Sequence, residues 1–222
     1  DEGEKAFPDV ADTPSLSDQG LAGVEDNSAF LDNRRYTGPV EHGHLKGQIS
    51  NRYAAVREDD INMEVKGQRV LVVGLGASGF AAARLLASKG AEVLVTESSD
   101  SEELREKAEL LARSGVKVEL GGHSVDLCSG VDLVVTSPGV DIRQGPAHEA
   151  FLRGVPVIGE LELGSRFCPS RIIAITGTNG KSTTTELIGR ILSLSGKDAV
   201  ACGNIGNPLC GEVDRLGPDS IA

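Results

Sequence analysis

A lysine-bearing loop between an apolar run and a helical pattern is the most specific chemical signal in the chain. Residues 172–175 are Ile-Ile-Ala-Ile, and they lead directly into Thr176-Gly177-Thr178-Asn179-Gly180-Lys181-Ser182-Thr183. In loops of this kind backbone N–H groups cradle phosphates, the lysine reaches the terminal phosphates and the next hydroxyl is placed for Mg²⁺. Ile175 stands where the general pattern has its first glycine, so the loop is a variant. The segment from Gly177 to Thr183 is predicted to bind a triphosphate, with Ser182 as the metal ligand.

A second phosphate-type loop lies about a hundred residues earlier. The apolar run 70–73 is followed by Gly74-Leu75-Gly76-Ala77-Ser78-Gly79, which is a G-x-G-x-x-G pattern opening a helix. Gly74 permits the tight turn, Gly76 lets the backbone approach a diphosphate, and Gly79 allows close packing of helix and strand. Glu97 is the acidic residue that often follows about 20 residues later to bind a ribose. Taken alone, this pattern favours NAD, and a tight turn that binds nothing is the alternative.

Two further turns are candidates for the same site. Ser137-Pro138-Gly139 follows an apolar run, and Gly203-Asn204-Ile205-Gly206 follows another. Ligands bind at the carboxyl edge of parallel sheets, which favours a binding role for Gly139 and Asn204. Turns rich in Pro, Gly and Asn are equally explained by backbone conformation alone.

Short apolar runs alternating with helical patterns indicate how these loops are held. Helices are predicted from about Gly79 to Ser88 and over about 102–113, with a short helix at Gly159-Glu160-Leu161-Glu162-Leu163 and another from the lysine loop to about Ser195. Strands are predicted near 69–73, 92–96, 116–120, 131–135, 155–158, 171–175 and 199–202. This alternation predicts an α/β fold, a Rossmann-like doubly wound parallel sheet in residues 67–168 followed by the start of a P-loop-type domain in 169–222.

The segment before this alternation has a different character. Residues 1–66 carry 14 acidic and 7 basic residues, frequent Gly and Pro, and no sustained apolar period. We predict a disordered acidic extension rather than a domain. Within it, Glu41-His42-Gly43-His44 offers too few ligands for a convincing metal site.

Composition restricts the partners. A formal net charge of -11 argues against a nucleic-acid surface, which needs clustered Lys and Arg. No apolar run approaches the ~20 residues of a membrane span, and no secretory signal is visible, so a cytoplasmic location is expected. Four cysteines, Cys128, Cys168, Cys202 and Cys210, lack CxxC spacing and are predicted to be buried thiols. We expect a monomer.

These motifs, in this order, resemble the Mur ligase family, and within it the D-glutamate-adding ligases. The resemblance covers about residues 66–222. The Thr-Gly-Thr-Asn-Gly-Lys-Ser element is characteristic of Mur ligases and the related folylpolyglutamate synthases, and the upstream domain ending in Gly-Glu-Leu-Glu-Leu is typical of the D-glutamate-adding type.

The resemblance implies an ATP-dependent ligase that adds D-glutamate to UDP-N-acetylmuramoyl-L-alanine through an acyl phosphate, in peptidoglycan precursor synthesis. It implies that ATP and Mg²⁺ bind at Gly177 to Thr183, where Lys181 neutralises charge on the phosphoryl oxygens as the catalytic residue. Glu97 departs from the aspartate common in the family. The UDP-substrate site is implied to comprise Gly74, Gly76, Ala77, Ser78, Gly79, Glu97, Ser98, Gly139 and Asn204.

In the family, further metal ligands, a carbamylated lysine and the groups that capture the amine lie beyond the position that matches Ala222. We therefore expect this chain alone to form no amide product. An NAD(P)-dependent oxidoreductase and a non-catalytic nucleotide-binding fragment are the alternatives.

Overall fold

The structure is a computed structural model and describes residues 63–222, except residues 125 and 205. Nearly all of the predicted extension over residues 1–66, including His42 and His44, lies outside the described residues.

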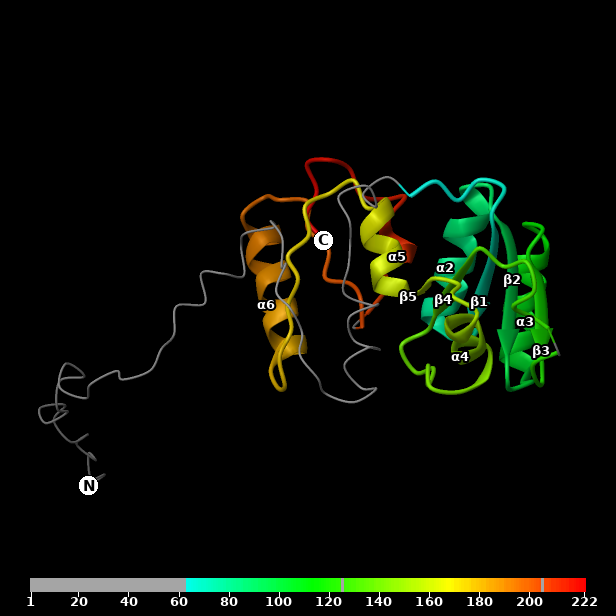
Figure 1. The fold of residues 1–222 in the computed structure, drawn as a ribbon. Coiled ribbons are helices and arrows are strands. Elements are labelled where there is room, and N and C mark those ends of the chain that lie inside the picture. The colour runs from blue at the N-terminus through cyan, green and yellow to red at the C-terminus, as the bar shows by residue number, and fades with distance from the viewer. Residues whose placement is uncertain (1–62, 125, 205) are drawn as a thin grey trace, which may run out of the picture. The chain divides into compact units, whose positions relative to one another are not determined.

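A five-stranded parallel sheet forms the core of residues 67–168 (Figure 1). Its strand order, β3-β2-β1-β4-β5, is that of a doubly wound fold, and the order reverses beside β1. All five strands predicted for this region are confirmed, with bounds shifted by two residues or fewer. They are β1 (Arg69–Val73), β2 (Glu92–Glu97), β3 (Lys117–Leu120), β4 (Leu133–Thr136) and β5 (Val157–Gly159).

Alternation of side chains along β1 divides the core into two layers. Val70 and Val72 face one side of the sheet, where they pack in a cluster with Leu86, whereas Leu71 and Val73 face a second cluster. These four side chains are at most 4% exposed. Burial on both faces explains why the strand is a continuous apolar run.

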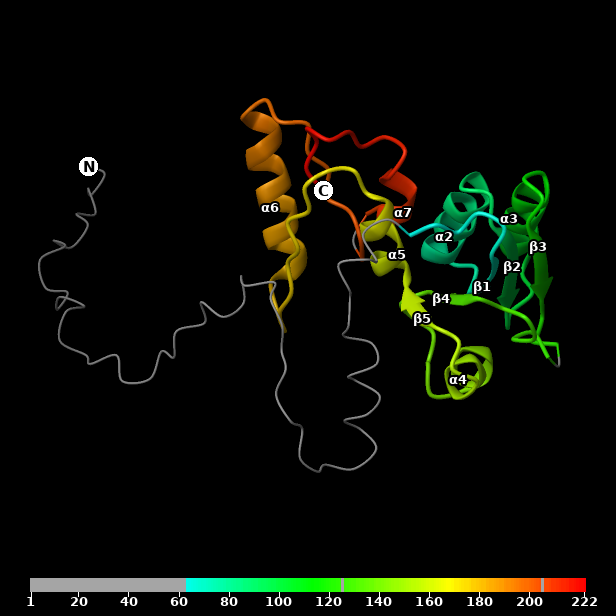
Figure 2. The ribbon, with the colours of Figure 1, turned by 45° about the horizontal axis from the view of Figure 1, so that its top comes forward.

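Helices cover both faces. The first cluster receives side chains from α2 (Ala77–Ser88), α3 (Glu102–Ala112), α5 (Glu160–Phe167) and α7 (Leu209–Glu212), and the second from α4 (Gly145–Leu152). Figure 2 shows α4 on the opposite side of the sheet from α2. The sequence reading predicted α2, α3 and α5 but missed α4, whose first turn holds Pro146, and the four-residue α7.

Residues 169–222 contain α6 (Lys181–Leu194), as predicted, but not the two predicted strands. The expectation of strands at 171–175 and 199–202 is wrong. Only isolated bridges form, between Ile221 and both Arg171 and Ala199, and between Cys202 and Asn207. The backbone hydrogen bonds here join Arg171 and Ile173 to Ala222, and Asp198 and Val200 to Ile221.

The cysteines follow the prediction in part. Cys128 and Cys210 are buried, whereas Cys168 and Cys202 are half-buried. Burial raises the pKa of Cys202 to about 11, so its thiol stays protonated at neutral pH. Across residues 63–222, residues 125 and 205 apart, no helix has the length and apolarity to cross a membrane.

Candidate functional site

The glycine loop between β1 and α2 has the geometry predicted from its sequence. Gly74 has φ +95°, a conformation that side chains disfavour. A Cβ on Gly79 would lie 1.9 Å from the carbonyl oxygen of Gly74, whereas a Cβ on Gly76 would meet nothing within 4 Å. The conformational roles of Gly74 and Gly79 are therefore confirmed, and Gly76 borders open space where a ligand can approach.

Glu97, at the end of β2, braces this loop. One carboxylate oxygen accepts a hydrogen bond from the N–H of Leu75 at 2.9 Å, and the other accepts from the Ser98 hydroxyl and the Ser99 N–H, both at 3.0 Å. Burial alone raises the pKa of Glu97, but the hydrogen bonds from Leu75, Ser99 and Ser98 outweigh it and leave the pKa below its usual value. Glu97 is thus an ionised support of the loop at neutral pH, with lone pairs left for a ligand.

The turn after β4 contacts the glycine loop directly. The Ser137 hydroxyl donates to the Gly74 carbonyl at 3.3 Å, and the Ser137 carbonyl accepts from the N–H of Val140 at 3.0 Å. The two loops follow neighbouring parallel strands, so they meet at the carboxyl edge where the strand order reverses.

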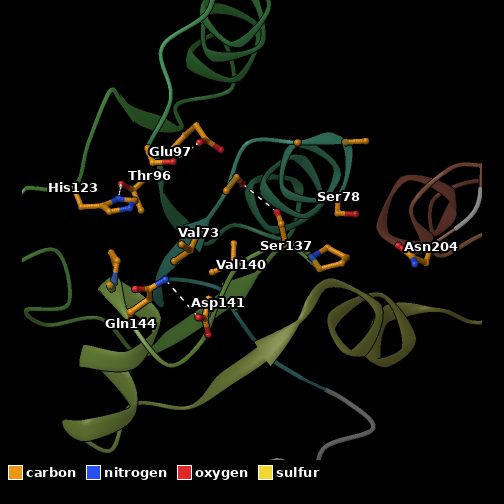
Figure 3. Close-up of a pocket in the computed structure, with 18 residues that line it drawn as sticks. Val73, Ser78, Thr96, Glu97, His123, Ser137, Val140, Asp141, Gln144 and Asn204 are labelled. Atoms are coloured by element: carbon orange, nitrogen blue, oxygen red, sulfur yellow. Dashed lines mark hydrogen bonds between the residues drawn. The ribbon is translucent and has the colours of Figure 1, made fainter.

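A pocket of about 770 Å³ opens along this edge (Figure 3). Its volume falls in the range of roughly 300–1,000 Å³ typical of small-molecule sites. Of the predicted UDP-substrate residues, only Gly79 does not line it, since Gly79 is buried beneath Gly74. The predicted residues that do line it are Gly74, Gly76, Ala77, Ser78, Glu97, Ser98, Gly139 and Asn204.

Several polar residues of the pocket were not predicted. Thr96, His123, Asp141 and Gln144 also line it. His123 follows β3 in a Gly-Gly-His turn, so its position at the end of a parallel strand was a usable signal. Asp141 accepts two hydrogen bonds from the Arg143 guanidinium, which lower the pKa of Asp141 to about 2.

Asn204 reaches the pocket from a distant part of the chain, and a buried contact holds its surroundings. The Glu160 carboxylate accepts a hydrogen bond from the Cys210 N–H at 2.8 Å, at the start of α7. A Cβ on Gly164 of α5 would lie 2.8 Å from Leu209, so the two helices are in close contact. These contacts anchor the segment that follows Asn204 against α5.

The lysine loop is arranged differently. Gly180 has φ +77° immediately before α6, and the Lys181 ammonium donates to the Gly177 carbonyl at 2.7 Å. Gly177 to Thr183 are all exposed, and none of them lines the pocket described above. Among the described residues, no group of three or more His, Cys, Asp or Glu side chains is arranged to hold a metal ion.

Part of the chain is similar to a known domain family. Residues 68–159 match the family model described as Mur ligase MurD-like, N-terminal domain. This segment runs from β1 to β5 and contains the glycine loop, Glu97 and the Ser137–Gly139 turn. The resemblance to Mur ligases seen in the sequence is confirmed for residues 68–159, which match this domain model.

Two relatives of known name are also similar to the chain. The chain is 49% identical over 146 residues to UDP-N-acetylmuramoylalanine--D-glutamate ligase of Koribacter versatilis, covering 66% of this chain and 32% of that protein. It is 46% identical over 154 residues to the enzyme of the same name from Pelotomaculum thermopropionicum, covering 69% and 34%. The chain therefore spans about a third of the length of the curated relatives it matches.

A solved structure gives a weaker likeness. The murein peptide ligase of Psychrobacter arcticus 273-4 is 26% identical over 60% of this chain and 28% of that chain, with a TM-score of 0.42. This score is too low to bear on function.

Proposed function

We propose that residues 67–168 bind the uridine diphosphate part of UDP-N-acetylmuramoyl-L-alanine, and that the protein containing this chain joins D-glutamate to that substrate with ATP. The relatives carry the name of this activity, and they share up to 49% identity with the chain. The further division at residue 169, with an ATP-binding segment in 169–222, is part of the same proposal.

The observation that supports this proposal most strongly is one pocket lined by five chain segments, four of which lie at the carboxyl edge of the sheet. It runs from His123 past Glu97 and the glycine loop to Asn204. The free N–H groups and positive dipole at the start of α2 suit a diphosphate. Glu97 and Ser98 then lie on the nucleoside side, and Gly139 and Asn204 on the side of the sugar and peptide.

The lysine loop suits a triphosphate with its metal. It offers an ammonium at Lys181, a hydroxyl at Ser182 and the N-terminus of a 14-residue helix, all exposed. ATP with Mg²⁺ supplies the phosphoryl group that activates a carboxylate toward amine attack as an acyl phosphate. Lys181 neutralises oxygen charge and Ser182 holds the metal, which are positioning and electrostatic roles.

Isothermal titration of the chain tests the first domain. UDP-N-acetylmuramoyl-L-alanine is expected to bind, and NADH is expected not to bind. Tight NADH binding with indifference to the UDP compound would overturn the proposal in favour of an oxidoreductase, the function that the glycine pattern alone favours.

A matched pair of lysine variants tests the second segment. Lys181→Met should abolish binding of ATP with Mg²⁺, whereas Lys197→Met, at an exposed lysine just beyond the other end of α6, should leave it unchanged. Equal affinities for the two variants would remove the lysine loop from the ATP site. ADP release by this chain that depends on both D-glutamate and UDP-N-acetylmuramoyl-L-alanine would contradict the expectation that the chain alone forms no amide product.

A further inference from the structure

The turn that carries Asn204 is closed by a backbone hydrogen bond between its ends. The N–H of Gly203 donates to the carbonyl of Asn207 at 2.8 Å, and Gly203 and Gly206 have φ +107° and +66°. Asn204 is exposed and lines the pocket, at the end that Ser78 of α2 also lines (Figure 3). Its place there depends on what holds the turn.

A buried carboxyl holds this turn. Glu212, the last residue of α7, is 7% exposed. One of its oxygens accepts a hydrogen bond from the side-chain amide of Asn207 at 2.6 Å, and the other accepts from the Arg215 guanidinium at 2.9 Å. Burying a carboxyl is unfavourable unless its oxygens are hydrogen-bonded, and both oxygens of Glu212 are. Burial has the largest effect on the pKa of Cys202, the residue before the turn, and the charge of Glu212 raises that pKa further. The carboxyl therefore lies close to both ends of the turn.

The helix that carries Glu212 is itself fixed beside the pocket. α7 packs against α5, and it also packs against α2, where a Cβ on Gly211 would lie 3.7 Å from the Cβ of Ala81. The first turn of α2, which begins at Ala77, lines the pocket. Glu212 therefore relates the turn of Asn204 to the same helix whose N-terminus suits a diphosphate.

We infer that Glu212 is a positioning residue for the proposed substrate, and that it holds Asn204 at the sugar-and-peptide end of the pocket through the amide of Asn207. Glu212 does not line the pocket, so it acts on a ligand only through the turn. A turn that is already held loses less conformational freedom when the ligand binds, so the affinity is higher. In the proposed placement UDP alone does not extend to Asn204, so the effect is specific to the sugar-peptide part. This inference rests on the proposed binding of UDP-N-acetylmuramoyl-L-alanine.

Titrations of the whole chain with UDP-N-acetylmuramoyl-L-alanine and with UDP test the inference. Wild-type protein is expected to bind the sugar-peptide compound more tightly than UDP. Glu212→Ala should weaken binding of that compound about tenfold, the value of one net hydrogen bond, and leave UDP binding unchanged. Asp214→Ala, which removes an exposed carboxyl two residues further along the chain, should change neither affinity.

Further variants separate positioning from packing. Asn207→Ala removes the same hydrogen bond at an exposed residue, so it should cause the same selective loss without leaving a buried cavity. Glu212→Gln keeps an oxygen that can accept from Asn207, so it should recover most of the lost affinity. In an Asn204→Ala background, Glu212→Ala should weaken binding no further, because a residue that acts through the Asn204 side chain has no effect once that side chain is removed.

The outcomes distinguish the two proposals. If Glu212→Ala and Asn207→Ala weaken binding of UDP and of the sugar-peptide compound equally, or if the losses from Glu212→Ala and Asn204→Ala add, Glu212 is only structural and the proposed function stands. If wild-type protein binds UDP as tightly as the sugar-peptide compound, the turn contributes nothing to binding and the inference is again overturned. If the wild-type chain binds neither compound, the proposed function fails, and the inference fails with it.

Discussion

Two regions of the described chain carry phosphate-type loops, but the loops are held in different ways. The glycine loop of residues 74–79 is braced by Glu97 from β2 and by Ser137 after β4, on a sheet buried on both faces. The lysine loop of residues 177–183 precedes α6, a helix with no buried residue. The sequence signal was more specific for the second loop, yet the structure frames the first more completely. The loop with the more specific sequence motif is therefore not the loop with more supporting contacts.

The exposed helix shows this difference most directly. Leu187, Ile191 and Leu194 of α6 are 57%, 53% and 83% exposed. Leu86 of α2, by contrast, is fully buried. Burial requires a partner surface as well as an amphipathic pattern, and α2 has such a surface because it packs on β1, β2 and β4.

Matched leucine truncations in the two helices should give the largest difference. Leu86→Ala is expected to lower the free energy of unfolding by about 2–5 kcal/mol, because it leaves a cavity under α2. Leu194→Ala should change it by no more than about 0.5 kcal/mol, because that side chain is exposed. Urea unfolding followed by circular dichroism measures both. If Leu194→Ala lowered the free energy of unfolding as much as Leu86→Ala, α6 would be packed in solution and the two regions would not differ in this respect.

Alanine substitutions at two glycines test the geometry of the first loop. Gly79→Ala places a Cβ 1.9 Å from a backbone oxygen, so we expect a loss of about 1–3 kcal/mol in stability together with weaker UDP binding. Gly76→Ala meets no atom within 4 Å, so it should keep its stability and lose affinity only. Unfolding curves and UDP titrations separate the two effects. Equal stability losses would contradict the assigned geometry.

The same contrast explains what could be predicted from the sequence. All five strands of the first region were predictable, because each contains a short stretch rich in Val, Leu or Ile. The strands at 171–175 and 199–202 were predicted on the same pattern and did not form, since pairing depends on neighbours that a local pattern does not reveal. The helix α4 was missed because its start, Gly145-Pro146, reads as a turn.

The candidate site was predictable only where a residue follows a recognisable loop. Gly74, Gly76 and Ser78 were found through the glycine pattern, and Asn204 through a turn after an apolar run. Thr96 was missed because it reads as an ordinary strand residue, and only the folded structure brings it to His123. The Glu97 carboxylate accepts a hydrogen bond from the N–H of Leu75, 22 residues earlier in the chain. The glycine pattern predicted that Glu97 lies near the loop, but it did not predict this hydrogen bond.

Removing the Glu160 side chain should test the link between the two regions. Glu160 of α5 accepts from the Cys210 N–H of α7, 50 residues away, and is 3% exposed. Glu160→Ala leaves that buried N–H without this partner, so it should lower the free energy of unfolding by about 1–3 kcal/mol. Glu162→Ala, on the same helix, removes a partly exposed pair with Arg166 and should cost less, at most about 1 kcal/mol. Urea unfolding compares the two variants, and the reverse order would show that Glu160 does not join the regions.

The pH dependence of Glu160 should give the smallest and most specific effect. Burial raises the pKa of Glu160 above its ordinary value of 4.5, because the hydrogen bonds from Cys210 offset only part of the desolvation. A carboxyl with a higher pKa in the folded state binds more protons when folded, so its contribution to stability falls as pH rises from 4.5 through the raised pKa. Below 4.5 this penalty is absent.

The variant Glu160→Gln isolates this effect, since its amide oxygen can still accept from Cys210 and does not titrate. Other carboxyls with shifted pKa values, such as Glu97 and Asp141, are present in both proteins and cancel in the comparison. Relative to Glu160→Gln, the wild-type protein should lose stability as pH increases above 4.5, measured by urea unfolding from pH 4 to 8. A difference that stays constant with pH would mean that Glu160 is solvated in the folded chain. The contact between α5 and α7 would then depend on the close approach at Gly164 and on the Cys210 thiol, which donates to the Glu160 backbone carbonyl at 3.3 Å.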